Sequence, residues 1–503
     1  MKTRRKTMSE LTENVLTENN KPLPAAQDEI KMDRAGVILL VLSFLAALLY
    51  CFAHSWTGSV CPGPGIGLTI SHWVLTGTVL AAAKARGRLT LRRDGLFLLV
   101  LSLLLSAVYG VFANTTLRRL NLPVLLLITA QALFALTGQN TASALSGQGL
   151  WEGFRRYLKS LFRCRSVPFT AVTRRTQHNG YLLPGILAAI CTMTLAAILL
   201  SSADQVFSGM LDSVAEKIRQ VDFLFVFRLF LALILTLLLF SHRFSLLQAP
   251  GAIRPVTTHA GNPTMFLMVL GSLVLVYALF GYVQIRYLFA GTESVRMSGG
   301  YAAYARSGFF QLVLVALLTL CLILPALTLF RENTGIRILC GLTAALTIII
   351  DVSAYLRMHL YIGAFGLSTL RVVTVWGIGV ILLALLAVIV KSIQPGLKIC
   401  PLLAAVILAS WVALNWVNMD RLVADSQVAR FNNDPENTGI YSLVSDQGWS
   451  PEYYAAFEKI ADPEKRADAL EFLIDLGSET HRDDRCLKHP ALYDWSFALL
   501  RAR

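Results

Sequence analysis

Apolar residues in this sequence gather into blocks of about 20 residues, separated by short polar segments. An α-helix rises about 1.5 Å per residue, so about 20 residues cross the roughly 30 Å hydrocarbon core of a bilayer. Inside lipid every backbone polar group must bond within the protein, which favours a helix for each block. The sequence therefore predicts an all-α membrane protein, a polytopic helical bundle of about eleven transmembrane helices. The blocks lie at 35–54, 65–84, 95–113, 120–139, 181–203, 222–242, 264–288, 307–330, 335–356, 369–391 and 399–416.

The composition agrees with a membrane protein. Hydrophobic residues make up 55% of the chain and charged residues 15%, against about 25% charged residues in soluble proteins. The formal net charge of +14 comes mostly from the loops between apolar blocks, so membrane topology explains it better than a nucleic-acid partner. We expect the lipid bilayer as a partner and no nucleic acid.

The distribution of Lys and Arg predicts the orientation. Of these residues, 25 lie in segments on the side of the N-terminus and nine in the loops of the opposite side. Loops rich in Lys and Arg stay in the cytoplasm. We therefore expect a cytoplasmic N-terminus and, after eleven crossings, an external C-terminus.

Three regions follow from this reading. Residues 1–34 are polar and proline-containing, which is typical of a disordered cytoplasmic tail. Residues 35–416 form the transmembrane domain, and residues 417–503 form a small soluble helical C-terminal module. In that module, Ser450-Pro451-Glu452 and Asp462-Pro463-Glu464 have the cap and first-turn proline of helix starts. We expect three short helices, one from Pro451, one from Pro463 to Gly477 and one near 490–500.

The segment 148–163, QGLWEGFRRYLKSLFR, differs from the transmembrane blocks. Its apolar residues recur at helical spacing, with Arg and Lys between them. One interpretation is an amphipathic helix on the anionic inner leaflet. The other is an ordinary basic loop helix that only enforces topology.

Sequence motifs of catalysis and metal binding are absent. The chain has no G-x-x-x-x-G-K-[ST], no H-E-x-x-H and no G-x-S-x-G, and its histidines never pair at helical spacing. We therefore predict no catalytic residue, no metal site and no cofactor.

Ionisable residues inside transmembrane blocks usually mark functional positions. Arg228 lies in the sixth block and Asp351 in the ninth. The Arg228 side chain is long enough to reach the headgroups, which needs no function. Asp351 is too short for that, so we expect it to have either an interhelical partner or a role in transport.

A group of residues at the outer block ends forms our candidate ligand site. Guanidinium groups suit phosphate and carboxylate, so an anionic lipid headgroup or small anion is the expected ligand, with headgroup anchoring as the alternative. We expect Arg306, Arg357 and Arg371 to converge near Asp351, one of them or Arg228 to reach its carboxylate, and Asp351→Asn to be harmful. The candidate ligand-binding residues are Tyr304, Arg306, Asp351, Arg357, Tyr361 and Arg371.

Two stretches carry a family resemblance. YLFAGTESVRMSGGYAAYARSGFFQL at 287–312 and SAYLRMHLYIGAFGLSTLR at 353–371 resemble a bacterial multi-pass membrane family known as domain of unknown function 4173, related to 4153. The resemblance covers roughly 265–461, and Ala303 departs from it where an acidic residue is expected. It implies a multi-pass protein of the bacterial plasma membrane, and it supplies no activity.

Our functional expectation is a non-enzymatic role in transport or envelope signalling, with an outer-face site for an anionic ligand or lipid headgroup. The C-terminal module would contact an envelope protein. The alternatives are a membrane-embedded enzyme acting on a lipid-linked substrate, which needs clustered acid and base groups, and a structural or assembly subunit.

Overall fold

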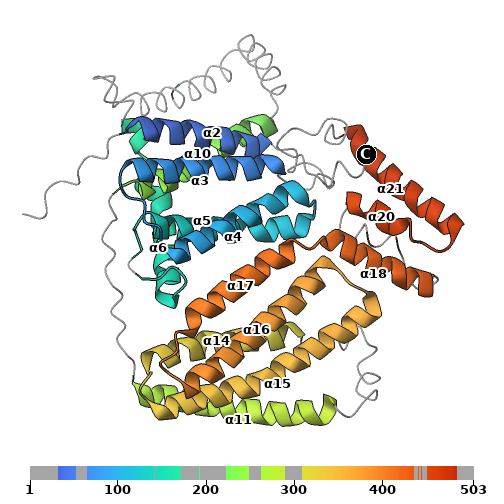
Figure 1. Ribbon diagram of the computed structural model, residues 1–503. Helices are drawn as coiled ribbons and strands as arrows, with labels where there is room; N and C mark the ends of the chain where they lie inside the picture. Colours follow the sequence, from blue (N-terminus) through green and yellow to red (C-terminus); the bar gives the residue numbers. More distant parts are fainter. Residues whose placement is uncertain are drawn as a thin grey trace, which may run out of the picture. The chain divides into compact units, whose positions relative to one another are not determined.

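The computed structural model describes residues 32–52, 65–140, 142–170, 192, 223–248, 262–288, 309–435, 440, 443 and 450–483. Every regular element in these ranges is a helix. The chain divides into two compact units, formed by Met1–Ile38 with Arg165–Lys217 and by Leu39–Cys164 with Ile218–Arg503. The second unit contains nearly all the described helices (Figure 1).

Nine helices in the described ranges are long and apolar enough to span a membrane. A tenth candidate, α17 (Ile399–Asn415), qualifies only together with α18 (Met419–Asn433), from which a 63° bend separates it. These ten match ten of the eleven predicted blocks, and the block at 181–203 lies outside the described residues. The nine are α2 (Arg34–Phe52), α3 (Ile66–Ala85), α4 (Arg93–Val111), α5 (Thr115–Leu136), α10 (Phe223–Leu246), α11 (Pro263–Leu288), α14 (Phe309–Leu329), α15 (Thr334–Phe365) and α16 (Thr369–Ile393).

The spans of the larger unit lie side by side and pack through two main apolar clusters (Figure 1). One cluster joins α4, α5 and α17 through residues such as Leu105, Ile128 and Trp411. The other joins α11, α14, α15 and α16 through residues such as Ile323 and Leu385. The remaining described helix of this region, α6 (Gly147–Arg163), crosses the ends of the spans instead of running along them (Figure 1).

Polar side chains begin several helices, because the first N–H groups of a helix have no partner within it. Asn114 accepts a hydrogen bond from Leu117 N at 2.8 Å, and Asn333 accepts one from Ile336 N at 3.1 Å. Ser146 caps α6 in the same way. These caps place the starts of α5, α15 and α6 at residues that the sequence specifies.

Helix α15 is longer than its apolar block. We expected it to end near residue 356, with Gly363 and Gly366 both in the following loop, but it continues to Phe365 and contains Gly363. Only Gly366 ends it, with φ at +73°, a conformation that glycine adopts at little cost. The prediction failed because hydropathy marks the membrane thickness, whereas a helix can continue into water.

The C-terminal module is helical in its described part. It contains α18, a 3-10 turn (Pro451–Tyr453) leading into α20 (Tyr454–Phe457), and α21 (Pro463–Asp483). The helix starts at Pro451 and Pro463 are confirmed, whereas the predicted stop at Gly477 is wrong because α21 continues past it. We did not predict α18, and the helix expected near 490–500 lies outside the described residues. The core of the module joins that of α4, α5 and α17 without a break.

Candidate functional site

A cavity of about 350 Å³ lies beneath α6, and we call it the α6 pocket. Side chains of α4, α5, α6 and α17 line it, and nearly all of them are apolar. Along α5 the lining runs from Val124 to Gln131, seven residues or about 10 Å at 1.5 Å per residue. The volume and apolar lining are those of a small-molecule site, and the length suits part of a hydrocarbon chain.

Exposed apolar side chains surround the pocket. Three of the lining side chains are each about 40% exposed: Leu127 of α5, and Leu150 and Phe154 of α6. The polar groups of the lining are the Gln131 amide and the Tyr157 hydroxyl. The pocket therefore opens at a surface that is apolar, not at one that is charged.

The circumference of α6 divides into three faces at 100° per residue. The buried face, with Gly149, Gly153, Arg156 and Ser160, packs on the spans. The second face exposes apolar side chains, and the third carries the remaining basic residues. The exposed apolar residues are Leu150, Trp151, Phe154, Leu158 and Phe162. This arrangement favours the amphipathic interpretation, because a loop helix in water would not expose an apolar stripe.

Two glycines allow α6 to lie close to α5 and to the connection between the two helices. A Cβ at Gly153 would overlap the Gln131 side chain, and a Cβ at Gly149 would overlap the Ser143 carbonyl. Gln131 Nε2 donates to the carbonyls of Ala144 and Gly149, at 2.8 Å each. The spacing Gly149-x-x-x-Gly153 is that of small residues at close helix contacts in membranes. It was the sequence signal for this contact, and our sequence analysis missed it.

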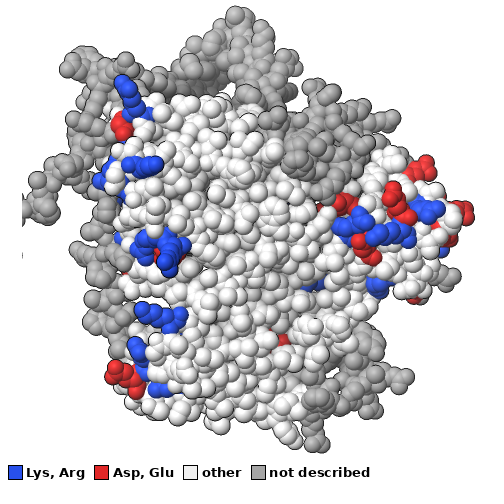
Figure 2. Space-filling view, in the orientation of Figure 1, with Lys and Arg blue, Asp and Glu red and all other residues white. Residues whose placement is uncertain are grey.

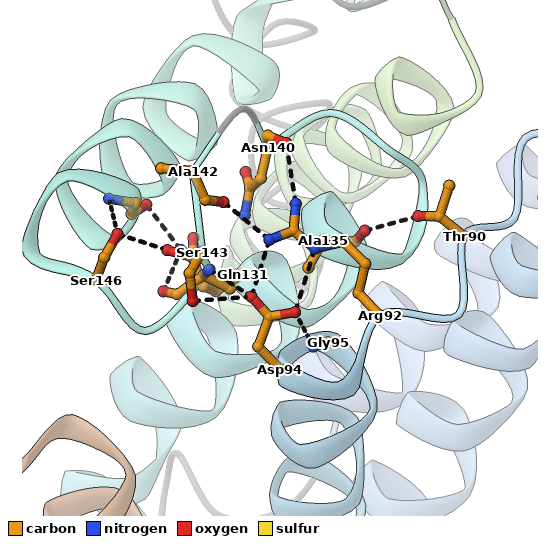
Figure 3. Close-up of polar contacts among 12 residues, drawn as sticks. Thr90, Arg92, Asp94, Gly95, Gln131, Ala135, Asn140, Ala142, Ser143 and Ser146 are labelled. Atoms are coloured by element: carbon orange, nitrogen blue, oxygen red, sulfur yellow. Dashed lines mark hydrogen bonds and ion pairs between the residues drawn. The ribbon is translucent and has the colours of Figure 1, made fainter. Parts of the chain in front are cut away.

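A polar network fixes the connection between α5 and α6 (Figure 3). Asp94 Oδ2 accepts from Ala144 N at 2.7 Å and from Ser143 Oγ at 3.1 Å. Arg92 forms an ion pair with Asp94 at 3.1 Å and donates to the carbonyls of Asn140 and Ala142. The N-terminus of α4 thus holds the segment from which α6 starts, directly beside the pocket.

The far end of α6 is attached to α10. Ser160 Oγ lies 2.7 Å from His242 Nδ1, and Ser241 Oγ donates to the Ser160 carbonyl at 2.7 Å. The Tyr157 ring stands edge-on to His242 at 5.0 Å between centroids. Burial raises the pKa of Tyr157, and the nearby Arg243 guanidinium opposes this rise. Tyr157 therefore stays a neutral phenol at the wall of the pocket.

Arg243 is a residue whose position the sequence did not reveal. We assigned it to a loop, but it lies in the last turn of α10 and is only 4% exposed. It contacts Thr76 of α3 at 3.4 Å. Hydropathy missed it because a charged residue next to an apolar block looks like the start of a loop.

The predicted outer residues are only partly brought together. Arg371 stacks over the Tyr361 ring at 4.4 Å and donates to the carbonyls of Phe365 and Gly366. These hydrogen bonds of the guanidinium stabilise the connection between α15 and α16. Tyr304 and Arg306 lie outside the described residues.

Asp351 has a different environment from the one we expected. It is 1% exposed, and neither carboxylate oxygen has a hydrogen-bond partner among the described residues. Neither Arg357 nor Arg371 bonds to it. Arg228, on α10, does not bond to it either.

Helix α18 docks on the α15–α16 connection. Gln427 Nε2 donates to the carbonyls of Phe365 and Leu367, and Arg430 donates to that of Ala364. A Cβ at Gly366 would meet the Gln427 amide, which is the flexible end of that side chain, so the positive φ is what requires glycine here. The stretch that carries the family resemblance therefore builds a docking surface for α18. No group of three metal-ligating side chains exists in the described part of the chain.

Comparison with known proteins gives one match. A family model described as "Domain of unknown function (DUF4153)" matches residues 91–448, from α4 through α18. No curated protein and no solved structure matches the chain. The resemblance to a multi-pass family of unknown function is confirmed at this level, through DUF4153 and not through the related 4173.

Proposed function

The chain belongs to the DUF4153 family, and we propose that it is a non-enzymatic protein of the bacterial plasma membrane that binds an inner-leaflet lipid in the α6 pocket. The observation that carries the proposal is an apolar cavity directly beneath an amphipathic helix. An acyl chain in the pocket would lie parallel to the spans, and its headgroup would lie at the level of α6. Binding of this kind serves lipid transport or signalling.

The surface charge supports the orientation that this proposal needs. Figure 2 shows Lys and Arg side chains gathered along one edge of the visible face, and mixed charges over the C-terminal module at the other edge. Lys84, Arg93, Lys159 and Lys398 are among the exposed basic residues at the α6 end of the spans. Since basic ends face the cytoplasm, α6 would lie on the inner leaflet and the module outside, where an envelope protein could contact it.

The composition of the pocket favours binding over catalysis. An enzyme for a lipid-linked substrate needs an acid or base near the reacting atoms. The lining offers an amide and a phenol, and no carboxylate, histidine or cysteine lines this pocket. The outer-face anion site has less support, because the Arg371 guanidinium is already bonded to carbonyls.

Photolabelling tests the proposal. The full-length protein is reconstituted with phosphatidylglycerol that carries a diazirine in its acyl chain, and labelled peptides are identified by mass spectrometry. Ala130, 2% exposed at the pocket wall, is replaced by Phe to fill the cavity. The Phe ring would occupy part of the space of the acyl chain, and a loss of about 1.4 kcal/mol in lipid binding lowers labelling of the pocket about tenfold.

The matched control is Leu126→Phe, on the same helix but 37% exposed and outside the pocket lining. It should leave pocket labelling unchanged. Lipid-facing Met265 and Met268 of α11 should label equally in all variants. Pocket labelling that survives Ala130→Phe, or that never exceeds that of α11, would refute the proposal.

A further inference from the structure

Asp351 is a buried carboxyl group to which no described residue offers a hydrogen bond. It lies in α15, is 1% exposed, and both of its oxygens lack a hydrogen-bond partner in the described part of the chain. A carboxylate without hydrogen bonds or a counter-charge is very costly in an apolar medium. The group is therefore expected to be neutral in this packing, and a neutral acid carries a proton.

The surroundings of Asp351 are apolar. Its neighbours on the buried side of α15, Ile350 and Ala354, pack in a cluster with Phe309 and Leu312 of α14 and Ile378 of α16. One turn earlier, Thr347 donates its hydroxyl to the Thr343 carbonyl within α15. The hydroxyl of a neighbouring helix is also engaged, because Tyr277 of α11 bonds to Thr319 of α14 at 2.8 Å.

Among the described residues, no charged group of α15 or of the adjoining helices bonds to Asp351. Arg357 is six residues beyond Asp351, which places it about 9 Å along the axis and about 240° around the helix. His359 stacks on Tyr355 at 6.2 Å, and Arg371 is bonded to carbonyls at the helix end. On α11 and α14, Tyr277 is paired and Cys321 is exposed. No described cation therefore compensates an ionised Asp351.

The choice between a metal cation and a proton follows from the ligands. A metal cation bound by protein oxygens needs about six ligands, as the hard cations Ca²⁺ and Mg²⁺ do. Asp351 belongs to no group of three metal-ligating side chains among the described residues. A proton needs only the carboxyl group.

We propose that Asp351 is a proton-binding site that couples protonation to the packing of α14 and α16 against α15. The protonated carboxyl fits the closed packing seen here. After the proton leaves, the carboxylate favours an arrangement in which these helices separate and water reaches it. The site is independent of the α6 pocket and gives the protein a means of coupling a proton gradient to a conformational change.

Infrared difference spectroscopy of the full-length protein in lipid nanodiscs tests the proposal. The wild-type spectrum minus that of Asp351→Asn should show the carbonyl stretch of a protonated acid at neutral pH. Asp351→Glu should shift this band, and Asp420→Asn, which removes a different buried carboxyl, should leave it unchanged. Carboxylate bands at neutral pH in place of the acid band would overturn the proposal.

A second measurement tests whether protonation of Asp351 is coupled to the packing of α14 and α16. Hydrogen–deuterium exchange in α14 and α16, corrected for the intrinsic rise of amide exchange with pH, should rise in step with loss of the acid band, and should be independent of pH in Asp351→Asn. Asparagine resembles the neutral acid in shape, so this variant should fold. Exchange that rises equally in wild type and Asp351→Asn would show that Asp351 does not control the packing.

Discussion

At the scale of single residues, the position of α6 depends on two glycines. Gly149 and Gly153 stand on the face of α6 that meets α5, and their missing Cβ atoms leave room for the Ser143 carbonyl and the Gln131 amide. Gln131 uses this proximity to donate to two carbonyls. Helix α6, which covers the α6 pocket, is thus held in place by hydrogen bonds to its backbone as much as by contacts between side chains.

Replacing Gly153 with Ala tests this arrangement. The new Cβ would overlap Gln131 and displace its hydrogen bonds, so stability should fall by roughly 1–3 kcal/mol. Thermal unfolding of the purified protein in detergent should show a lower midpoint. Gly147→Ala is the matched control, since a Cβ there meets nothing within 4 Å. Equal midpoints for the two variants would show that close approach of α6 is unnecessary.

At the scale of secondary-structure elements, α18 joins the C-terminal module to the spans. Besides its bonds to the α15–α16 connection, it contributes Asp420, whose carboxylate accepts from Asn114 Nδ2 of the α5 cap and from Ser450 Oγ at 2.7 Å. Burial raises the pKa of Asp420, and the hydrogen bonds from Ser450 and Asn114 oppose this rise. On the same helix, the pKa of Asp425 is lowered: burial raises it, and hydrogen bonds from Lys459 and Arg421 outweigh burial.

These two aspartates predict opposite pH dependences for docking of the module. A raised folded pKa means that the folded state binds more protons, so docking weakens as pH rises from about 3.9 through the folded pKa of Asp420. Asp420→Asn should abolish this weakening. The contribution of Asp425 is present above about 3.9 and is lost as pH falls through its folded pKa, so Asp425→Asn should change the profile only at acid pH.

Hydrogen–deuterium exchange of α18 and α20 across this pH range, corrected for the intrinsic pH dependence of amide exchange, measures the docking. If Asp420→Asn keeps the wild-type dependence above about pH 4, another group causes it. The comparison with Asp425→Asn controls for general effects of removing one negative charge from α18.

At the scale of the whole molecule, the basic α6 end and the mixed-charge C-terminal module predict which side of the membrane each occupies (Figure 2). Lys159 of α6 and Glu458 of the module are both exposed, which makes them suitable for labelling. In a cysteine-free background, Glu458→Cys should react with an impermeant thiol reagent in intact cells. Lys159→Cys should react only after permeabilisation. The reverse pattern would show that the bundle has the opposite orientation.

Much of the membrane domain could be predicted from the sequence. Each span must be apolar over the same thickness, so ten helices match their blocks within a few residues, apart from the earlier start of α5 and the later end of α15. The candidate site could be predicted from the sequence only in small part. Arg371 and Tyr361 do meet, but the expected partner of Asp351 is not found among the described residues. Chain order and membrane level cannot show which way a side chain points around its helix.

The sequence by itself determined the class of this protein and its spans, because hydrophobic thickness is a local requirement. Only the tertiary structure decided what the polar residues do. Gln131 holds α6 through carbonyls that lie 13 and 18 residues away, and Asn114 meets Asp420 across 306 residues. Such contacts depend on which helices become neighbours and at what rotation. Hydropathy leaves both open, because lipid accepts any apolar face equally well.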